Sequence, residues 1–212
     1  MTVKLIWITP DAERLIAQIA RVSNPSNQDN PNFKQLLMYM VKNAHWSPFE
    51  MASACFEINT TRDIGRQILR HRSFSFQEFS QRYADVSALP PVAFRECRLQ
   101  DIENRQNSVP TTDEPTTDAW LGIQKHVYDT AVAHYKDALN MGVAKEQARA
   151  LLPEGLTPSR LYMSGTIRSW MHYTELRSDV STQKEHRVLS SAISEELKRH
   201  LPTVWSVLGE IM

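Results

Sequence analysis

Cysteine is scarce in this sequence of 212 residues, which contains only Cys55 and Cys97 and no Cys-x-x-Cys pair. Two cysteines in unlike contexts give no basis for a disulfide framework or a zinc finger. Glycine is also rare: there are six, and none forms the Gly-x-Gly-x-x-Gly run of a dinucleotide-binding Rossmann unit. The sequence therefore gives no sign of any of these three common kinds of site.

Neither sign of charge predominates, because lysine plus arginine and aspartate plus glutamate each number 24. Without a global positive field, the protein has no general means of holding a long polyanion such as DNA. We therefore expect no nucleic-acid partner. Any phosphate group that binds should be small and held locally.

Long apolar runs are absent as well, and no stretch approaches the ~20 residues that a membrane span needs. The N-terminal residues lack the basic start, apolar stretch and small-residue cleavage site of a secretion signal. Together with the few cysteines, these absences favour a reducing, cytoplasmic location and no membrane partner. A length of 212 residues suits one well-buried domain, so we expect residues 1–212 to form a single domain.

Hydrophobic periodicity predicts a mixture of strands and helices. The expected strands are Val3–Thr9, Ala52–Ile58 and a short one near Leu161. The expected helices are one that opens at Pro10-Asp11, one around Phe33–Val41, Thr61–Arg70 with Thr61 as cap, Asp118–Asn140, Lys145–Leu152 and Val180–His200. We expect loops at Asn24–Pro31 and Ser73–Gln81, and an irregular excursion over Pro90–Thr117.

Three arginines, Arg62, Arg66 and Arg70, recur every four residues, so a helix would place them on one face. Like charges in such a row repel one another unless an anion or an acidic partner lies among them. The simplest interpretation is a solvated basic face with Glu78 and Asp63 as ion-pair partners. Taken alone, this run is weak evidence for a site.

The residues that follow form a denser pattern: Arg70-His71-Arg72, seven residues, then Ser80, with Glu78, Arg82 and Tyr83 around that serine. This stretch resembles the signature of the flavin-dependent thymidylate synthases. Further blocks resemble the same family in the same order, namely His45-Trp46-Ser47-Pro48-Phe49-Glu50, Ala148-Arg149 with Leu152-Pro153, and Arg168-Ser169-Trp170 with Leu176-Arg177. The resemblance spans about Val3 to Arg187.

The resemblance implies an α/β fold of the α+β type, with a mostly antiparallel central sheet flanked by helices and a helical extension. It implies a homotetramer with active sites shared between subunits. The implied reaction is the reductive methylation of dUMP to dTMP, in which methylenetetrahydrofolate gives the carbon and NADPH reduces FAD. No metal and no cysteine nucleophile are implied.

The family's functional residues can be carried over position by position. For dUMP they are Gln67, Arg70, Glu78, Ser80, Arg82, Arg149 and Arg177. For FAD they are Ser47, Glu50, Arg70, His71, Arg72, Glu78, Arg168 and His172. The resemblance places His45 on the folate side of the flavin and gives Arg177 and Ser80 the catalytic and substrate-positioning roles.

These residue types suit the chemistry. Guanidinium and hydroxyl donors bind a phosphate, as Arg82 and Ser80 can, and a fixed cation at Arg177 can stabilise negative charge on a pyrimidine under attack. Arg168 and His172, four residues apart, would share one helical face, and Arg177 would fall on the opposite side. Two different ligands would then meet the two faces.

Three positions depart from the family pattern: Met51 where many relatives have His, Gln77 where Asn is usual, and Thr166 where many have Asn. Gln77 and Thr166 keep hydrogen-bonding ability, whereas Met51 does not. The departures concern the flavin and folate geometry, and they support one alternative, a non-catalytic nucleotide-binding relative.

A second alternative is a conventional thymidylate synthase, which attacks the uracil ring with a cysteine thiolate. That nucleophile needs an accessible cysteine in electropositive surroundings. Cys55 falls in an apolar strand-like segment and is expected to be buried, and Cys97 falls in the irregular excursion. We expect the reaction to survive replacement of either cysteine by serine.

Overall fold

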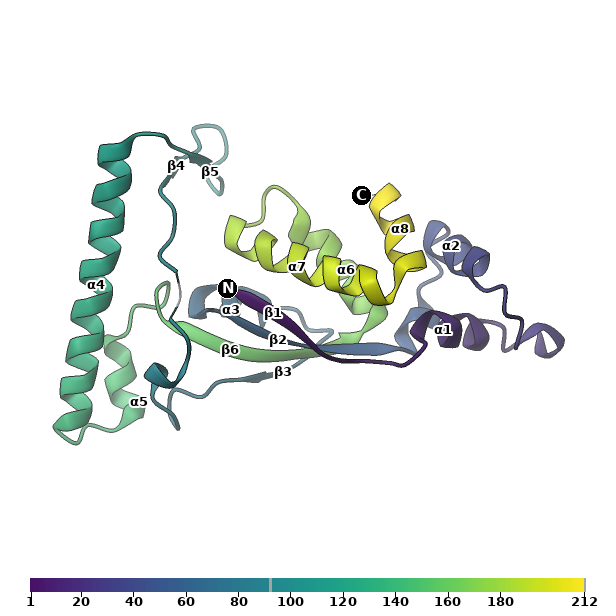
Figure 1. Ribbon diagram of the computed structural model, residues 1–212, viewed down its shortest axis with the longest axis horizontal. Coiled ribbons are helices and arrows are strands. Elements are labelled where there is room, and N and C mark those ends of the chain that lie inside the picture. Colours follow the sequence, from purple (N-terminus) through teal and green to yellow (C-terminus); the bar gives the residue numbers. More distant parts are fainter. Residues whose placement is uncertain (92, 212) are drawn as a thin grey trace. The chain divides into compact units, whose positions relative to one another are not determined.

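The computed structural model describes residues 1–91 and 93–211 of the chain; Val92, within the predicted excursion, and Met212 lie outside the described residues. The described strands are β1 (Thr2–Ile8), β2 (Ser53–Thr61), β3 (Ser75–Glu78), β4 (Arg98–Gln100), β5 (Ser108–Pro110) and β6 (Pro158–Thr166). The described helices are α1 (Ala12–Ala20), α2 (Lys34–Lys42), α3 (Arg62–Ile68), α4 (Glu114–Asn140), α5 (Lys145–Ala148), α6 (Ile167–Ser178), α7 (Lys184–His200) and α8 (Pro202–Ile211) (Figure 1). Short 3-10 helices lie at η1 (Pro25–Asn27), η2 (Ser47–Glu50), η3 (Val86–Ala88) and η4 (Arg149–Leu151).

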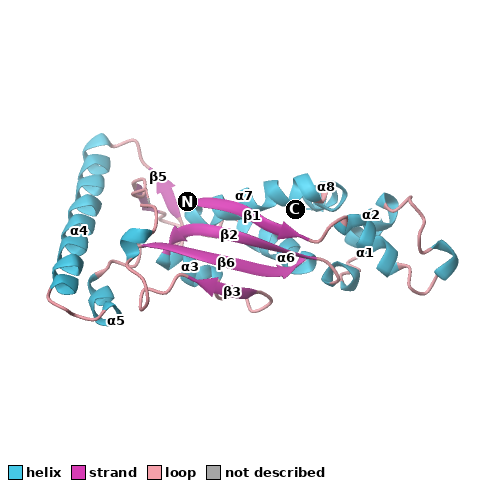
Figure 2. Ribbon diagram, turned by 60° about the horizontal axis from the view of Figure 1, so that its bottom comes forward, coloured by secondary structure: helices cyan, strands magenta, loops and turns pink. Residues whose placement is uncertain are grey.

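Four strands form a sheet in the order β1-β2-β6-β3 (Figure 2). The backbone N–H that follows the end of β1, at Thr9, donates to Ser53 at the start of β2, so these two strands are antiparallel. Likewise, the N–H of Arg62, after the end of β2, donates to the carbonyl of Thr157, just before β6. β4 and β5 form a separate antiparallel pair. The predicted mixture of helices with a mostly antiparallel sheet is confirmed.

The chain divides into two compact units. Unit 1 comprises Met1–Thr2, Ile58–Arg70 and Gln77–Leu161, and unit 2 comprises Val3–Glu57, His71–Phe76 and Tyr162–Met212. Four of the five boundaries fall inside strands, namely β1, β2, β3 and β6, and the fifth lies between Arg70 and His71. The expectation of a single domain over residues 1–212 therefore stays a prediction, and each unit is described separately below.

The core of unit 2 centres on Trp170 of α6, which is fully buried. Its indole ring lies edge-on to Phe74 and Phe56, with ring centroids 4.7 and 4.9 Å away. Its Nε1–H donates to the carbonyl of Ala54 at 3.1 Å, so the one polar atom of the ring is satisfied inside the core. Helix α7 packs against both α6, which precedes it in the chain, and α8, which follows it (Figure 1).

The backbone at Gly165, near the end of β6, lies very close to the Phe74 ring. A Cβ atom at this position would lie 2.4 Å from Cδ1 of Phe74. Real side chains do not approach so closely, so the position requires glycine unless the Phe74 ring moves. Gly165 thus allows Phe74 to pack against Trp170.

The start of α8 is capped by a residue from the opposite end of the sequence. The buried carboxylate of Glu13, on α1, accepts hydrogen bonds from the backbone N–H groups of Thr203 and Val204 at 2.7 and 3.0 Å. These N–H groups have no partner within the helix, and a negative charge is favourable at a helix N-terminus. Glu13 thereby joins α1 to α8.

Unit 1 has its own apolar clusters. One lies around α4 and α5 and consists of Val86, Tyr135, Ala138 and Ala148, with Leu139 and Leu152 packed against it. Ile58 of β2, Ile64 and Ile68 of α3, and Leu161 of β6 are also fully buried. The Asp113 side chain caps α4 by accepting from the N–H of Thr116 at 3.1 Å.

Several predicted boundaries were wrong. The segment Ser73–Gln81, expected to be a loop, contains the edge strand β3, in which exposed and half-buried residues alternate. The excursion Pro90–Thr117 contains the β4–β5 pair and the first turn of α4. Helix α7 starts at Lys184 rather than Val180, because the Asp179 side chain accepts from the N–H of Ser181 at 2.8 Å and forms a turn there. Helix α8 was not expected.

Candidate active site

A cavity of about 410 Å³ lies in unit 2. Its lining residues are Trp46, Glu50, Ser73, Arg168, Ser169, Met171, His172, Glu175 and Leu208. Helix α6 supplies five of them. Its N-terminus is fixed by Thr166, whose hydroxyl accepts from the N–H of Ser169 at 3.2 Å. The predicted shared face of Arg168 and His172 is confirmed, since both side chains line this cavity.

Arg168 forms an ion pair with Glu50, the last residue of the 3-10 helix η2. Nearly half of each side chain is exposed, at 49% and 41%. An exposed pair of this kind contributes little to stability. Since a guanidinium carries five N–H donors, Arg168 can hold Glu50 and still donate to an anion. The cavity therefore combines a mostly apolar wall of Trp46, Met171 and Leu208 with a cationic, hydrogen-bonding side.

Arg177, in the last turn of α6, contacts His71 instead of this cavity. Its Nε–H donates to Nε2 of His71 at 2.9 Å. In this bond Nε2 of His71 is the acceptor, so it carries no proton there. The sequence placed Arg177 on the side of the helix opposite Arg168 and His172, and its separate partner agrees with that.

A buried polar pair lies next to His71. Tyr173 of α6 and His186 of α7 are both fully buried, and the tyrosine hydroxyl lies 3.0 Å from Nε2 of His186. Burial, reinforced by the positive charge of Arg177 and by His71, lowers the pKa of His186 from 6.5 to about 3. Burial also raises the pKa of Tyr173 well above its ordinary value. Both groups are therefore uncharged at neutral pH, and Arg177 provides the positive charge next to them.

In unit 1, the basic face of α3 meets Glu78. Its carboxylate lies 3.6 Å from Arg62 and 3.7 Å from Arg66, and it accepts a hydrogen bond from the Ser159 hydroxyl at 2.9 Å. Burial, together with the neighbouring positive charge of Arg66, lowers the pKa of Arg62, although the charge of Glu78 acts in the opposite direction. The sequence-based expectation that Glu78 neutralises this face is confirmed.

Two parts of that expectation need correction. Helix α3 ends at Ile68, so Arg70 lies beyond it and does not share the helical face of Arg62 and Arg66. Thr61 precedes the helix as predicted, but its hydroxyl makes no capping bond to the backbone and donates to Asp63 instead, at 2.5 Å. The carboxylate of Asp63 is held by Arg95 and not by the arginines of α3.

Arg82 and Arg149 meet at one residue, Glu146. Arg82 contacts the Glu146 carboxylate through two nitrogens at 3.2 and 3.3 Å, and Nε–H of Arg149 donates to the Glu146 carbonyl at 3.2 Å. Ser80 is exposed, and its carbonyl accepts from the N–H groups of Tyr83 and Ala84 in a turn. The structure thus brings together two of the arginines that the family resemblance assigns to the nucleotide.

The predicted site residues divide between the two units. Unit 1 holds Gln67, Arg70, Glu78, Ser80, Arg82 and Arg149, and unit 2 holds His45, Ser47, Glu50, His71, Arg72, Arg168, His172 and Arg177. Within unit 2, only Glu50, Arg168 and His172 of this set line the cavity. His45 is exposed and lies edge-on to Tyr39, with ring centroids 5.5 Å apart.

Sequence reasoning missed several lining residues. Glu175 could have been found, because it follows Arg168 and His172 at helical spacing. Leu208 could not, because α8 itself was not predicted. Among residues 1–91 and 93–211, no group of three His, Cys, Asp or Glu side chains could hold a metal ion. None of the helices in the same residues is both long and apolar enough to cross a membrane.

Comparisons with known proteins agree with the fold and with these groups of arginine and histidine. The family model of thymidylate synthase complementing proteins matches residues 4–203, so the chain belongs to this family. Within it, the similarity is to proteins named flavin-dependent thymidylate synthases. A probable one from Paramecium bursaria Chlorella virus 1 is 46% identical over 216 residues, covering 98% of this chain and 99% of its own. Another, from Synechocystis sp., is 48% identical over 196 residues, covering 92% and 89%.

A solved structure supports the same placement. The UMP/dUMP methylase PolB from Streptomyces cacaoi, bound with 5-Br dUMP, superposes with a TM-score of 0.84 at 27% sequence identity. The match covers 99% of this chain and 94% of the methylase. The similarity therefore extends over nearly the whole fold and not only over the short signature.

Proposed function

We propose that this protein catalyses flavin-dependent synthesis of dTMP by reductive methylation of dUMP. The observation that carries the proposal is the near-complete coverage, at 46% and 48% identity, by relatives named for this activity. The site geometry is compatible with it, because unit 2 has a cavity with a cationic side and unit 1 has a cluster of arginines. We further propose methylenetetrahydrofolate as the carbon donor and NADPH as the reductant.

The residues of the unit 2 cavity fit a flavin. Its volume of about 410 Å³ falls within the roughly 300–1,000 Å³ of small-molecule sites. Trp46, Met171 and Leu208 offer apolar surface to a planar ring, while Arg168 and His172 offer donors to its polar or phosphate groups. When bound, FAD supplies the hydride that the reaction needs. We assign Ser47, Glu50, Arg70, His71, Arg72, Glu78, Arg168 and His172 to it, with His45 on the folate side.

For dUMP we propose Gln67, Arg70, Glu78, Ser80, Arg82, Arg149 and Arg177. Arg82 and Ser80 would bind the phosphate, and Arg177 would stabilise the negative charge that develops on the pyrimidine. The hydrogen bond from Nε of Arg177 to Nε2 of His71 helps to orient the guanidinium. We also propose that residues 1–212 act as one domain within a cytoplasmic homotetramer.

The alternatives from the sequence are less well supported. Cys55 is 8% exposed, and burial raises the pKa of its thiol, which opposes the thiolate that a cysteine nucleophile requires. A non-catalytic nucleotide-binding relative is not favoured, because the relatives that cover the chain are named as synthases.

The test is anaerobic incubation of the purified protein with FAD, NADPH, dUMP and methylenetetrahydrofolate, with dTMP measured by chromatography. We expect dTMP only when flavin is present. Arg177→Ala should reduce its formation by roughly 10²–10³-fold, as for the loss of one charge-stabilising donor. Arg199→Ala, which removes an exposed arginine paired with Glu196 on α7, is the matched control and should retain activity. Formation of dTMP without flavin, or none with all components, would contradict the proposal.

A further inference from the structure

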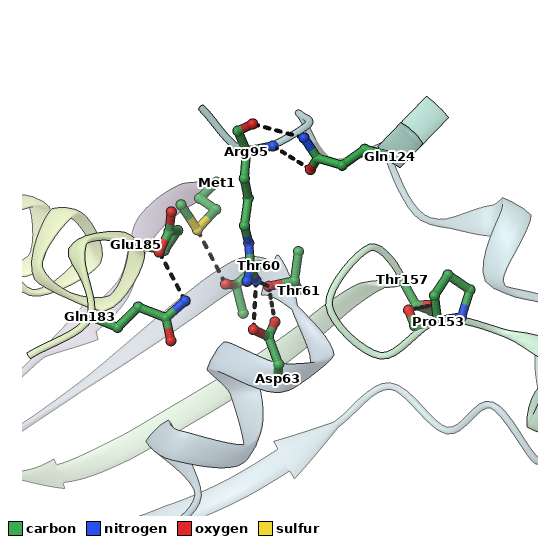
Figure 3. A network of polar contacts seen from close by, with 10 residues as sticks. All are labelled: Met1, Thr60, Thr61, Asp63, Arg95, Gln124, Pro153, Thr157, Gln183 and Glu185. Carbon is green, nitrogen blue, oxygen red and sulfur yellow. Dashed lines mark hydrogen bonds and ion pairs between the residues drawn. The ribbon is translucent and has the colours of Figure 1, made fainter. Parts of the chain in front are cut away.

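Arg95, in the irregular segment before β4, holds the start of α3. One of its terminal nitrogens, Nη2, donates to Oδ2 of Asp63 at 2.6 Å and to the Thr61 hydroxyl at 3.2 Å (Figure 3). The Thr61 hydroxyl in turn donates to the other carboxylate oxygen of Asp63 at 2.5 Å. A single nitrogen of Arg95 therefore fixes both residues at the entrance to this helix.

The backbone of the same residue is held by α4. The Gln124 side chain accepts from the N–H of Arg95 at 2.9 Å and donates to its carbonyl at 2.9 Å (Figure 3). Nε1–H of Trp120 donates to that carbonyl at 3.1 Å. Gln124 is only 3% exposed, so its amide is committed to this contact. We call Arg95, Asp63, Thr61, Gln124 and Trp120 the Arg95 clamp.

Stability alone does not explain the clamp. The side chains of Arg95 and Asp63 are 21% and 26% exposed, so both charges lose much of their hydration. Nε of Arg95 is buried without a hydrogen-bond partner among residues 1–91 and 93–211, which adds a cost. Replacing a largely buried ion pair by apolar residues is often neutral or stabilising. An ion pair with an unsatisfied donor therefore suggests a positional role.

That role concerns α3 and the residues that it carries. Asp63 lies in the first turn of α3, next to Arg62 and three residues before Arg66, the two arginines that contact Glu78. Gln67 lies on the same helix, and Arg70 lies two residues beyond the end of the helix at Ile68. Through Trp120 and Gln124, the clamp thus ties the segment that supplies part of the proposed dUMP site to α4.

We propose that Arg95 is a positioning residue for the nucleotide, holding α3 through Asp63 so that its donors are aligned before dUMP binds. The inference rests on the proposed function. Since the clamp touches none of the residues assigned to the chemistry, its loss should affect binding of dUMP and not the reaction of bound dUMP.

The test uses the FAD-loaded protein and measures the dissociation constant of dUMP by titration calorimetry, with KM and kcat from dTMP formation. We expect Arg95→Met to raise the dissociation constant and KM roughly tenfold and to leave kcat within about twofold. Arg95→Lys should bind nearly as wild type, because a single nitrogen makes both contacts in the clamp. Arg98→Met, three residues on, breaks the ion pair with Glu96 and serves as the matched control.

Asp63→Ala gives an independent measurement if Arg95→Met does not fold. It should weaken dUMP binding as much as Arg95→Met, and the double variant should be no weaker than either one. Tighter dUMP binding by Asp63→Ala would overturn the inference, since it would show that the carboxylate merely repels the phosphate. So would a lower melting temperature of Arg95→Met with an unchanged dissociation constant. Wild-type protein that fails to bind dUMP would instead overturn the proposed function.

Discussion

The neutral, buried His186 makes the stability of the protein depend on pH in a definite window. In the unfolded chain this ring takes up a proton as the pH falls through its ordinary pKa of 6.5, whereas in the folded protein its pKa is about 3. Between these values the unfolded state binds more protons, so the free energy of unfolding falls as the pH falls. The contribution is fully present above pH 6.5 and is progressively lost below it.

Its magnitude follows from the two pKa values. Lowering the pH from about 7.5 to about 5 should cost roughly 2 kcal/mol through this one histidine, since each full unit is worth about 1.4 kcal/mol. His186→Gln removes the titrating ring and keeps a polar side chain beside Tyr173. The difference in unfolding free energy between wild type and His186→Gln should therefore shrink by roughly 2 kcal/mol over that interval.

Urea denaturation followed by circular dichroism at the two pH values gives both free energies. His134→Gln, which replaces a histidine on α4 whose side chain is 67% exposed, is the matched control for removal of one imidazole. A difference between wild type and His186→Gln that stays constant over the interval would refute the reasoning. It would mean that the folded protein binds the proton as readily as the unfolded chain does.

Two further substitutions test the packing and the cysteines. Gly165→Ala places a methyl group against the Phe74 ring and should lower the free energy of unfolding by about 1–3 kcal/mol, measured by urea denaturation. Adding Phe74→Leu to the same chain should recover part of this loss. An unchanged free energy of unfolding in Gly165→Ala would show that the ring moves aside freely. Cys97→Ser should leave dTMP formation intact, whereas a loss of activity would revive a cysteine nucleophile. Cys55→Ser should also remain active but lose about 1–3 kcal/mol of stability, because it buries a hydroxyl in an apolar strand.

Local periodicity predicted the parts of the site that depend on one helix. The spacing of Arg168 and His172 placed them on one face of α6, and both line the unit 2 cavity. The same reasoning could not find Leu208. Helix α8 buries Val204, Trp205, Val207 and Leu208, and its exposed positions include Pro202 and Gly209, so its sequence gives only a weak helical signal.

Partners distant in sequence were only half predictable. The sequence offered two carboxylates for the arginines of α3, and charge alone could not distinguish them. Glu78 takes that role, while Asp63 pairs with Arg95, 32 residues away in a segment that was expected to be irregular. The edge strand β3 was missed for a related reason, since its pairing with β6 is a property of the sheet and not of four polar and aromatic residues.

The contact between Glu13 and α8 has a consequence for biosynthesis. The two N–H groups that this carboxylate caps belong to residues made 190 and 191 positions later. Until α8 is made, the nascent chain carries α1 and α2 without the helix that packs on α2 and whose first turn donates to Glu13. Unit 2 cannot close until α8 has been synthesised. Its completion awaits emergence of α8 from the ribosome, and until then its apolar surface is exposed to chaperones and to aggregation.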